Sequence, residues 1–356
     1  MKTKINILEF CSAFFMVTVS PFLGMGLYNL LKIANVDSTI SIILGYILSF
    51  LILIIFFIIH NYKPELDLKE KIDKLFNKTS SIIIKIILSL CFFVLAAFLS
   101  YNLNSFVISQ FLSETPILFI SIIISILIIY INSKGIEVIL RVSNLLFFIS
   151  IILMLIAIFG KYNKMDMTNL LPLLKDGIEI PFKGSTNIIL LNSIYIFILL
   201  MIPKKNIDNK HINIILVITN TLVYIVFFII TSYTLGVLGI DLALLYHYPA
   251  YIIMKEVSIF GFIDKIENFI IIHWIFEIFI NLSLITYFIN KMTNIKPYII
   301  VVANIILYTL IFKNSTLFNL LITKYVPILS IIIIICILII VLKITIKKTE
   351  LSVSKI

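Results

Sequence analysis

The sequence is poor in charged residues and cysteine, and it lacks the common catalytic motifs. Only 13% of its 356 residues are Asp, Glu, Lys or Arg, against roughly 25% in soluble domains, which disfavours an ordinary soluble fold. Its three cysteines, Cys11, Cys91 and Cys336, lie in apolar stretches without a CxxC pair or a nearby histidine. Neither a disulfide framework nor a metal site is expected. No Walker loop, GxSxG or HExxH pattern occurs, so an enzyme or a bound cofactor has no support.

Long apolar segments dominate the chain. Hydrophobic residues make up 61% of it, and its mean hydropathy is +1.17. A transmembrane helix needs roughly 20 apolar residues, and the hydrocarbon of a bilayer admits only helices or closed barrels with shorter strands. We therefore expect an all-α polytopic membrane protein, with a single transmembrane domain at residues 1–345 and a short cytoplasmic tail at 346–356. Ten transmembrane helices are expected at 8–33, 38–60, 82–110, 115–132, 136–160, 182–203, 211–239, 268–290, 296–312 and 322–344.

The net charge of +10 is carried mainly by lysines in the short connections between apolar runs. An even number of spans puts both termini on one side of the membrane. That side receives 17 lysines and the opposite side 9, and the positive-inside rule then predicts that both termini are cytoplasmic. The basic charge is thus explained by contact with membrane lipid, and nucleic-acid binding is not expected.

One cytoplasmic connection has a pattern of its own. Residues 64–78 alternate acidic residues and lysines with apolar residues. This pattern fits a short amphipathic helix lying in the membrane interface. It fits a solvated linker equally well, so the residues leave both interpretations open.

The first apolar run is interrupted by Ser20-Pro21-Phe22-Leu23-Gly24-Met25-Gly26. Pro21 removes a backbone donor, and the two glycines allow neighbouring chains to approach closely. Such a break either lines a cavity, where free backbone groups hold a carboxylate or an ion, or is a proline kink at a helix crossing. The pattern is compatible with both. The candidate ligand-binding residues here are Phe22, Gly24, Met25 and Gly26.

Polar residues inside the apolar runs are costly in lipid, so each faces the interior or marks a functional path. These residues are Lys85, Tyr101, Asn102, Asn104, Asn187, Asn192, Tyr195, His273, Glu277 and Asn281. The last three recur every four residues and therefore share one face of the helix expected at 268–290. That face is either a structural polar seam or a path that relays a proton or selects an ion.

Several short motifs resemble those of one family. Gly24-Met25-Gly26 is similar to a GxG break, and an Asp-Ser-Thr-Ile-Ser segment opens the second run at the expected distance. Lys134-Gly135-Ile136-Glu137-Val138-Ile139-Leu140-Arg141 resembles a K-G-x-E-x-x-x-R segment. Two outer-loop motifs follow, Asn169-Leu170-Leu171-Pro172-Leu173-Leu174 and Tyr248-Pro249 with Phe262-Ile263-Asp264-Lys265-Ile266-Glu267 and Trp274. In this order, they resemble the endospore germination permeases, the B subunits of germinant receptors within the amino acid/polyamine/organocation transporter superfamily.

The resemblance implies a LeuT-like fold of two five-helix inverted repeats, with the first and sixth spans broken near the midplane. It implies that a nutrient, typically an amino acid, binds there and that A and C subunits complete a receptor in the cell or inner spore membrane. The sixth run departs from the family pattern, because Leu191-Asn192-Ser193-Ile194-Tyr195 replaces a Pro, Phe, Gly and Glu sequence. Tyr101, Asn192, Ser193 and Tyr195 complete the expected ligand site.

Two other functions remain open. A secondary amino-acid transporter would use the same fold by alternating access, although the missing carboxylate of the sixth run argues against a coupled ion site. A structural subunit without a ligand would have its pocket filled by side chains such as Phe22, Tyr195 and Phe197. The leading hypothesis is a germinant-sensing subunit whose partners detect a change of helix packing.

Overall fold

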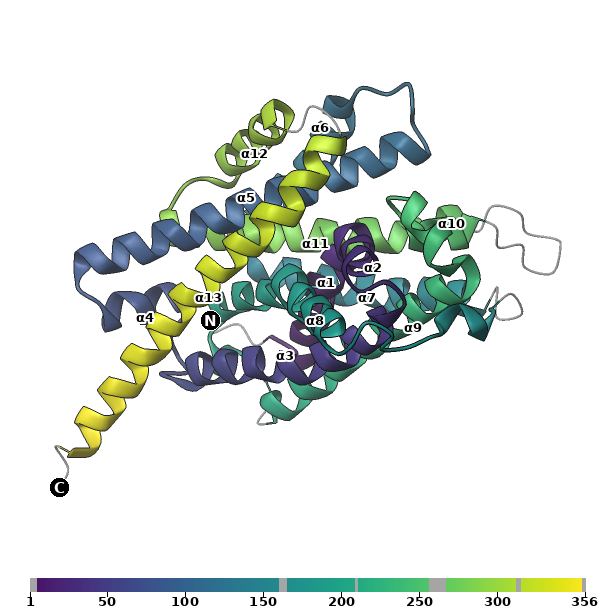
Figure 1. The fold of residues 1–356 in the computed structure, drawn as a ribbon. Coiled ribbons are helices and arrows are strands. Elements are labelled where there is room, and N and C mark those ends of the chain that lie inside the picture. The colour runs from purple at the N-terminus through teal and green to yellow at the C-terminus, as the bar shows by residue number, and fades with distance from the viewer. Residues whose placement is uncertain (1–4, 160–164, 209–210, 256–266, 312–314, 354–356) are drawn as a thin grey trace.

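The computed structural model describes residues 5–159, 165–208, 211–255, 267–311 and 315–353, and helices dominate all five stretches (Figure 1). The helices of the first half are α1 (Ile7–Pro21), η1 (Phe22–Gly26), α2 (Leu27–Ala34), α3 (Ser38–Asn61), α4 (Leu68–Leu75), α5 (Lys78–Gln110), α6 (Ile117–Lys134) and α7 (Ile136–Phe159). Those of the second half are α8 (Glu179–Asn192), η5 (Ser193–Met201), α9 (Ile212–Leu245), α10 (Pro249–Lys255), α11 (Glu267–Thr293), α12 (Pro297–Ile311) and α13 (Ser315–Val353).

Within the described residues, eight helices are long and apolar enough to cross a membrane. One of them, Ile7–Asn61, contains both runs expected at 8–33 and 38–60, and its backbone leaves helical geometry between them at Asn35 (φ 47°, ψ −129°), where the 3₁₀ turn η2 (Asn35–Asp37) begins. Pro297–Ile311 is a shorter apolar helix. The chain is therefore an all-helical, multi-pass integral membrane protein. The count of ten spans stays a prediction.

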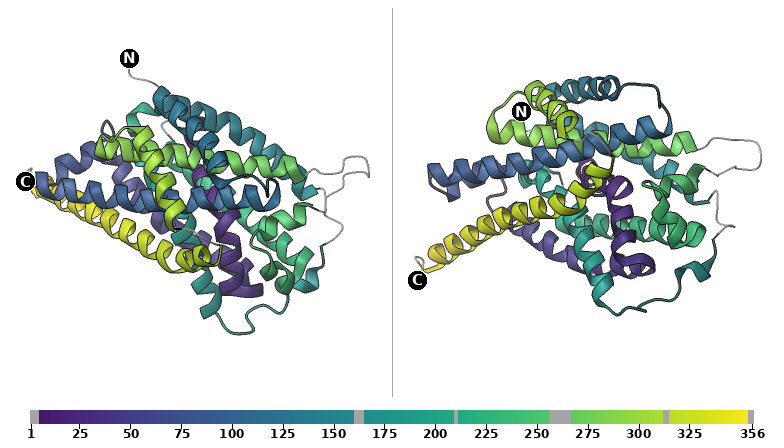
Figure 2. Two further views of the ribbon diagram at one scale, coloured as in Figure 1. Left: turned by 90° about the horizontal axis from the view of Figure 1, so that it is seen from above. Right: turned by 45° about the horizontal axis from the view of Figure 1, so that its top comes forward.

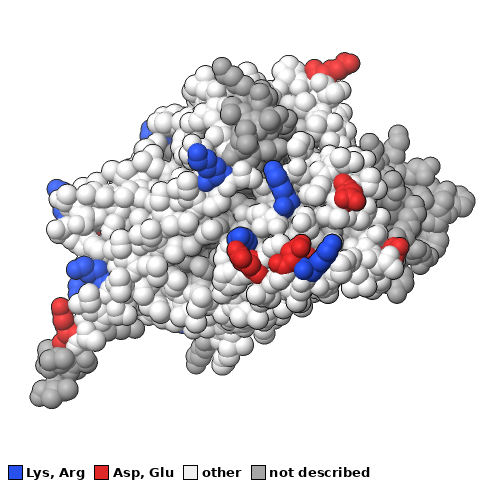
Figure 3. All heavy atoms as spheres, in the orientation of Figure 1, with Lys and Arg blue, Asp and Glu red and all other residues white. Residues whose placement is uncertain are grey.

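The outer surface of the bundle is apolar, as a bilayer requires. Large aliphatic side chains are exposed along the outward faces of several helices, for example Leu51 on α3 at 58%, Ile126 on α6 at 60% and Leu342 on α13 at 60%. Figure 3 shows few Lys, Arg, Asp and Glu side chains on one face of the molecule, where other residues cover most of the surface. Exposed apolar surface of this extent is stable only against lipid.

Helix α1 occupies the middle of the bundle, between α7, α11, α9 and η5 (Figure 1). Every residue from Phe10 to Pro21 is buried. Asn6 caps the helix and forms a capping box with Glu9, which fixes where it begins. Figure 2 shows α13 and α5 running along one side of the molecule. The first run is thus the core around which the other helices pack.

Several connections meet at one end of the bundle. The N–H of Ile5 donates to the carbonyl of Asn206 at 2.8 Å, which joins the start of the first run to the segment after the sixth. Lys71 of α4 is fully buried, and its Nζ donates to the carbonyl of Ile59 at 2.9 Å. Burial lowers the pKa of Lys71 to about 8. Lys71 therefore remains mostly charged at neutral pH and caps the negative end of α3.

Helices α9 and α13 extend furthest beyond the expected ends of their runs. In α9 the backbone leaves helical geometry at Gly239 (φ 68°, ψ 169°), the predicted end of the run, and a second helical stretch continues to Leu245. Glycine tolerates the positive φ that this kink requires. Helix α13 extends to Val353, so residues 346–353 of the expected tail are helical. The interfacial segment at 64–78 contains a true helix, α4, with a capping box between Asp67 and Glu70.

Candidate ligand-binding site

The interruption of the first run is the π-helical segment η1, whose flanking residues keep helical dihedral angles. The resemblance had implied that the first span is broken at this point, but the chain remains helical here. Because Pro21 has no N–H, the carbonyl of Val17 lacks its usual helical partner, and Asn281 Nδ2 donates to it at 3.2 Å. Trp274 Nε1 donates to the carbonyl of Ser20 at 2.9 Å. Asn281 of α11 thus supplies the hydrogen bond that the proline removes, and Trp274 adds a second bond from α11 to the backbone of α1.

The two backbone N–H groups at the ends of η1 are bonded. The N–H of Phe22 donates to the carbonyl of Val19, and the N–H of Leu27 donates to the carbonyl of Phe22. These two positions flank residues 24–26, where N–H groups free to hold a carboxylate were expected, and that expectation stays a prediction. The segment is closer to the alternative, a proline-containing kink with glycines where helices cross.

Both glycines of η1 lie in close packing. A Cβ atom on Gly24 would overlap Asn102 Oδ1 and Trp274 Cζ2. A Cβ atom on Gly26 would lie 3.2 Å from the side-chain amide of Asn192. The first contact requires the side chains of Asn102 and Trp274 to move, and the second is tight. Gly24 therefore lets two other helices approach the backbone of η1.

A cavity of ≈ 350 Å³, which we call the η1 cavity, borders this segment. Its walls belong to η1, α2, α5, the connection from α9 to α10, and α13. The lining residues are Gly24, Met25, Tyr28, Asn29, Asn102, Ser105, Ser109, Gln110, Leu245, Tyr246, His247, Tyr248, Ile252, Phe318 and Ile322. These described residues offer amide, hydroxyl, imidazole and aromatic groups but no carboxylate or ammonium. The volume and lining suit a small polar solute.

Aromatic rings surround the η1 cavity. The ring of Tyr28 meets His247 edge-on with centroids 5.5 Å apart. Phe106 contacts Tyr248 at 4.8 Å and Trp274 at 4.6 Å, both edge-to-face. These geometries are favourable for aromatic pairs. Through these contacts the α9–α10 connection packs against Trp274, whose indole N–H donates to the backbone of α1. The cavity wall and the interrupted helix therefore belong to one packed cluster.

The sixth run changes from α-helix to the 3₁₀-helix η5 at Asn192 and Ser193. All nine residues of η5 are buried. Ser193 Oγ lies 3.1 Å from Tyr224 Oη, within hydrogen-bond distance. Asn192 Nδ2 donates to the carbonyl of Ile188 at 2.9 Å. In the described part of the chain, neither Asn192 Oδ1 nor Tyr195 Oη has a hydrogen-bond partner. The expected local change at 192–193 exists, but it is enclosed by packing.

The candidate residues therefore fall into two groups. Gly24 and Met25 line the η1 cavity, whereas Gly26 packs against Asn192. Phe22 stacks on Phe227 with centroids 3.9 Å apart. Phe22, Asn192, Ser193, Tyr195, Phe197 and Tyr101 do not belong to the cavity lining. Phe22, Tyr195 and Phe197 are buried, and the cavity lies on another side of η1.

The cavity-lining residues Tyr28, Asn29, Tyr246 and His247 were not among the candidates. No periodicity identifies them, because they come from α2 and a connection that meet only in the folded chain. Asn102 was recognised as an intramembrane polar residue, and its Nδ2 lies 3.4 Å from the carbonyl of Gly24. The available sequence signals were thus the interruption at 20–26, which pointed to Gly24 and Met25, and an amide in an apolar run.

The polar seam of α11 is completely buried. His273 is 2% exposed, Glu277 1% and Asn281 0%. Asn281 Nδ2 also donates to Ser20 Oγ at 2.8 Å, so this end of the seam holds α1 and α11 together. Glu277 Oε2 has no hydrogen-bond partner among the described residues. A buried carboxyl in a membrane helix is a candidate functional group.

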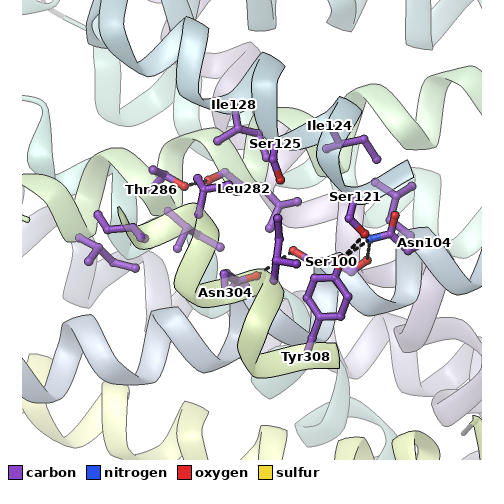
Figure 4. Close-up of a pocket in the computed structure, with 17 residues that line it drawn as sticks. Ser100, Asn104, Ser121, Ile124, Ser125, Ile128, Leu282, Thr286, Asn304 and Tyr308 are labelled. Atoms are coloured by element: carbon purple, nitrogen blue, oxygen red, sulfur yellow. Dashed lines mark hydrogen bonds between the residues drawn. The ribbon is translucent and has the colours of Figure 1, made fainter. Parts of the chain in front are cut away.

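A second, smaller polar cavity lies between α5, α6, α11 and α12 (Figure 4). Its volume is ≈ 30 Å³, enough for about one or two water molecules. Asn104 Nδ2 donates to Tyr308 Oη at 3.3 Å, and Ser100 Oγ donates to Asn304 Oδ1 at 3.1 Å. Tyr308 Oη also donates a hydrogen bond to Ser121 Oγ. This network joins three helices, α5, α6 and α12, and the cavity is too small to hold a nutrient.

The geometry and the motif series agree with a comparison against known families. Residues 8–296 match the family described as spore germination protein. The chain belongs to this family. It is similar to spore germination protein KB of Bacillus subtilis (strain 168), with 24% identity over 265 residues, which cover 72% of this chain and 69% of that protein. The family and the apolar helices together give the chain a permease-like, germination-related role in a membrane.

Proposed function

We propose that this chain is the transporter-like subunit of a germinant receptor and that a small nutrient solute binds in the η1 cavity. The observation that carries the proposal is the position of the cavity beside η1. Asn102 both lines the cavity and lies 3.4 Å from the carbonyl of Gly24. This bond is long, so a solute that binds Asn102 competes with it at small cost. Occupation of the cavity is thereby linked to the packing of η1 against α5.

The response follows from the same contacts. A ligand shifts a conformational equilibrium only through its different affinity for the two states. The interrupted helix is held by side-chain donors from α5 and α11, which move with those helices. A solute that redirects Asn102 favours a different position of α5 relative to η1. Partner chains on the outer surface of the bundle then detect the changed packing.

The family resemblance supports the finer features of the proposal. These are ten spans in two LeuT-like inverted repeats, cytoplasmic termini, and A and C subunits as partners in the cell or inner spore membrane. Ile5 meets Asn206, and Lys347 Nζ donates to the carbonyl of Lys74 at 3.2 Å. Segments expected on the cytoplasmic side therefore lie together at one end of the bundle, as an even number of spans requires.

Binding can be tested with the purified full chain in detergent. A panel of amino acids, monosaccharides and nucleosides is added, and thermal unfolding is followed. Amino acids are the class that the resemblance implies, while the uncharged lining suits the other two equally. We expect one class to raise the unfolding temperature, and the Ser109→Phe variant, which fills the cavity wall, to lose this effect. Ser113→Phe is the matched control, since Ser113 is exposed outside the cavity. No stabilisation by any compound would contradict binding by the isolated chain.

A secondary transporter is a second candidate, favoured by the buried carboxyl of Glu277. A proton or a cation on Glu277 would satisfy its unpaired Oε2 atom, and transporters couple solutes to such ions. The test is uptake of the stabilising solute into proteoliposomes with an imposed pH or sodium gradient. Gradient-driven uptake that Glu277→Gln abolishes would establish transport. Binding without uptake would leave the receptor function.

A further inference from the structure

A groove of ≈ 600 Å³ lies between α5 and α12, beside α4 and the end of α11. Its walls are apolar for most of their length, with Ile86, Leu90 and Phe93 from α5 and Ile299 and Ala303 from α12. Ile86, Leu90 and Ile299 are 46–57% exposed. Such side chains face lipid in a membrane protein, so the groove opens toward the acyl chains of the bilayer.

One end of the groove is basic. Lys69 of α4 and Lys85 of α5 belong to its lining, which contains no acidic residue among those described. Lys69 Nζ donates to the neutral Asn294 Oδ1 at 2.9 Å. Lys85 Nζ is paired with Asp73 Oδ1 at 2.6 Å. The lining therefore carries two ammonium groups, one of which is paired with a carboxylate outside the lining, and such a basic end complements an anionic phosphate.

The dimensions fit one leaflet. From Lys85 to Phe93 the groove follows eight residues of α5, which correspond to roughly 12 Å of helix. Half of a hydrocarbon core of about 30 Å is about 15 Å. The basic end lies beside α4, whose amphipathic pattern suits the membrane interface. The lysines therefore reach headgroup level while the apolar walls remain within the acyl region.

We propose that this groove is a binding site for one phospholipid with a negatively charged headgroup. An acyl chain lies along the wall formed by Leu90, Phe93 and Ala303, and the headgroup phosphate lies between Lys69 and Lys85. A neutral lipid would contact the apolar walls without a net charge to pair with the lysines. A soluble phosphate would pair with the lysines without contacting the apolar walls. The bound lipid joins α4 and α5 to α12, away from the η1 cavity, so this site is independent of the solute that the receptor detects.

The test uses the delipidated full chain in detergent, with lipid retention followed by native mass spectrometry and stability by thermal unfolding. Phosphatidylglycerol, phosphatidylcholine and inorganic phosphate are compared. We expect phosphatidylglycerol to bind most tightly and to stabilise most. Each of Lys69→Gln and Lys85→Gln should weaken it about fivefold, since a lysine near anionic lipid contributes about that factor. Both variants should leave phosphatidylcholine binding unchanged.

Two further variants separate the headgroup from the acyl chain. Ala303→Phe narrows the groove and should weaken the binding of both lipids. Lys296→Gln is the matched control for the two lysine variants, because Lys296 is at the same end of the groove but outside its lining. Equal binding of the two lipids by the unmodified chain would overturn the proposal. So would an unchanged preference in the Lys69→Gln/Lys85→Gln double variant, or displacement of phosphatidylglycerol by equimolar inorganic phosphate.

Discussion

The first and sixth apolar runs both change helix type near their middle, but they solve the resulting hydrogen-bonding problem differently. In the first run, η1 is π-helical and its region receives side-chain donors from Asn102, Trp274 and Asn281. In the sixth run, η5 is a 3₁₀-helix in which every residue is buried. Buried polar atoms of the sixth run, Asn192 Oδ1 and Tyr195 Oη, find no partner among the described residues.

This difference indicates that the two runs have different roles in the structure. Side-chain donors on other helices can move with those helices, so the hydrogen bonds around η1 are adjustable, and a cavity lies next to them. The sixth run is packed on all sides and resembles a rigid support. The proposed ligand site, the η1 cavity, therefore lies on one side of η1, and no residue of η5 lines it.

The largest effect is expected at Gly24. Gly24→Ala forces a Cβ atom against Asn102 and Trp274, and overpacking of this kind costs typically about 1–3 kcal/mol. Gly26→Ala meets only the 3.2 Å contacts with Asn192 and Phe22 and should cost clearly less. Thermal unfolding of both variants in the same detergent measures the difference. Equal destabilisation would show that the close approach at Gly24 is not special.

Asn281→Leu is the next test, because it removes the donor that replaces the missing N–H of Pro21. The carbonyl of Val17 and Ser20 Oγ then lose their partner in a buried site, at a cost of on the order of 1–2 kcal/mol. Chemical or thermal unfolding in detergent gives the value. A variant as stable as the unmodified chain would mean that α11 does not stabilise the interrupted helix.

The smallest effect is expected in the sixth run. Tyr195→Phe removes a buried hydroxyl that has no partner within the described residues, so stability should stay the same or rise. Tyr308→Phe is the matched control, since the Tyr308 hydroxyl bonds Asn104 and Ser121. Its loss should cost about 0.5–1.5 kcal/mol. If Tyr195→Phe destabilises as much as Tyr308→Phe, the packed sixth run also depends on polar bonds.

Sequence reasoning predicted the helical segments well, because an apolar run of about 20 residues has one stable form in lipid. It also located the interruption at 20–26, since proline and two glycines cannot continue an ordinary helix unchanged. It could not predict that η1 would remain helical, because the replacement donors come from Trp274 and Asn281, more than 250 residues away. The η1 cavity was equally hidden, since tyrosines and a histidine of the α9–α10 connection complete it only in the folded chain.

The most direct test of a ligand site beside η1 uses Trp274, the single tryptophan of the chain. Its indole bonds Ser20 and packs on Phe106 and Tyr248, so its emission should report movement of the cavity wall. The compound that raises the unfolding temperature should change Trp274 fluorescence with the same concentration dependence, and Ser109→Phe should abolish both. Stabilisation without any change in fluorescence, or a change that persists in Ser109→Phe, would contradict a ligand site in the η1 cavity.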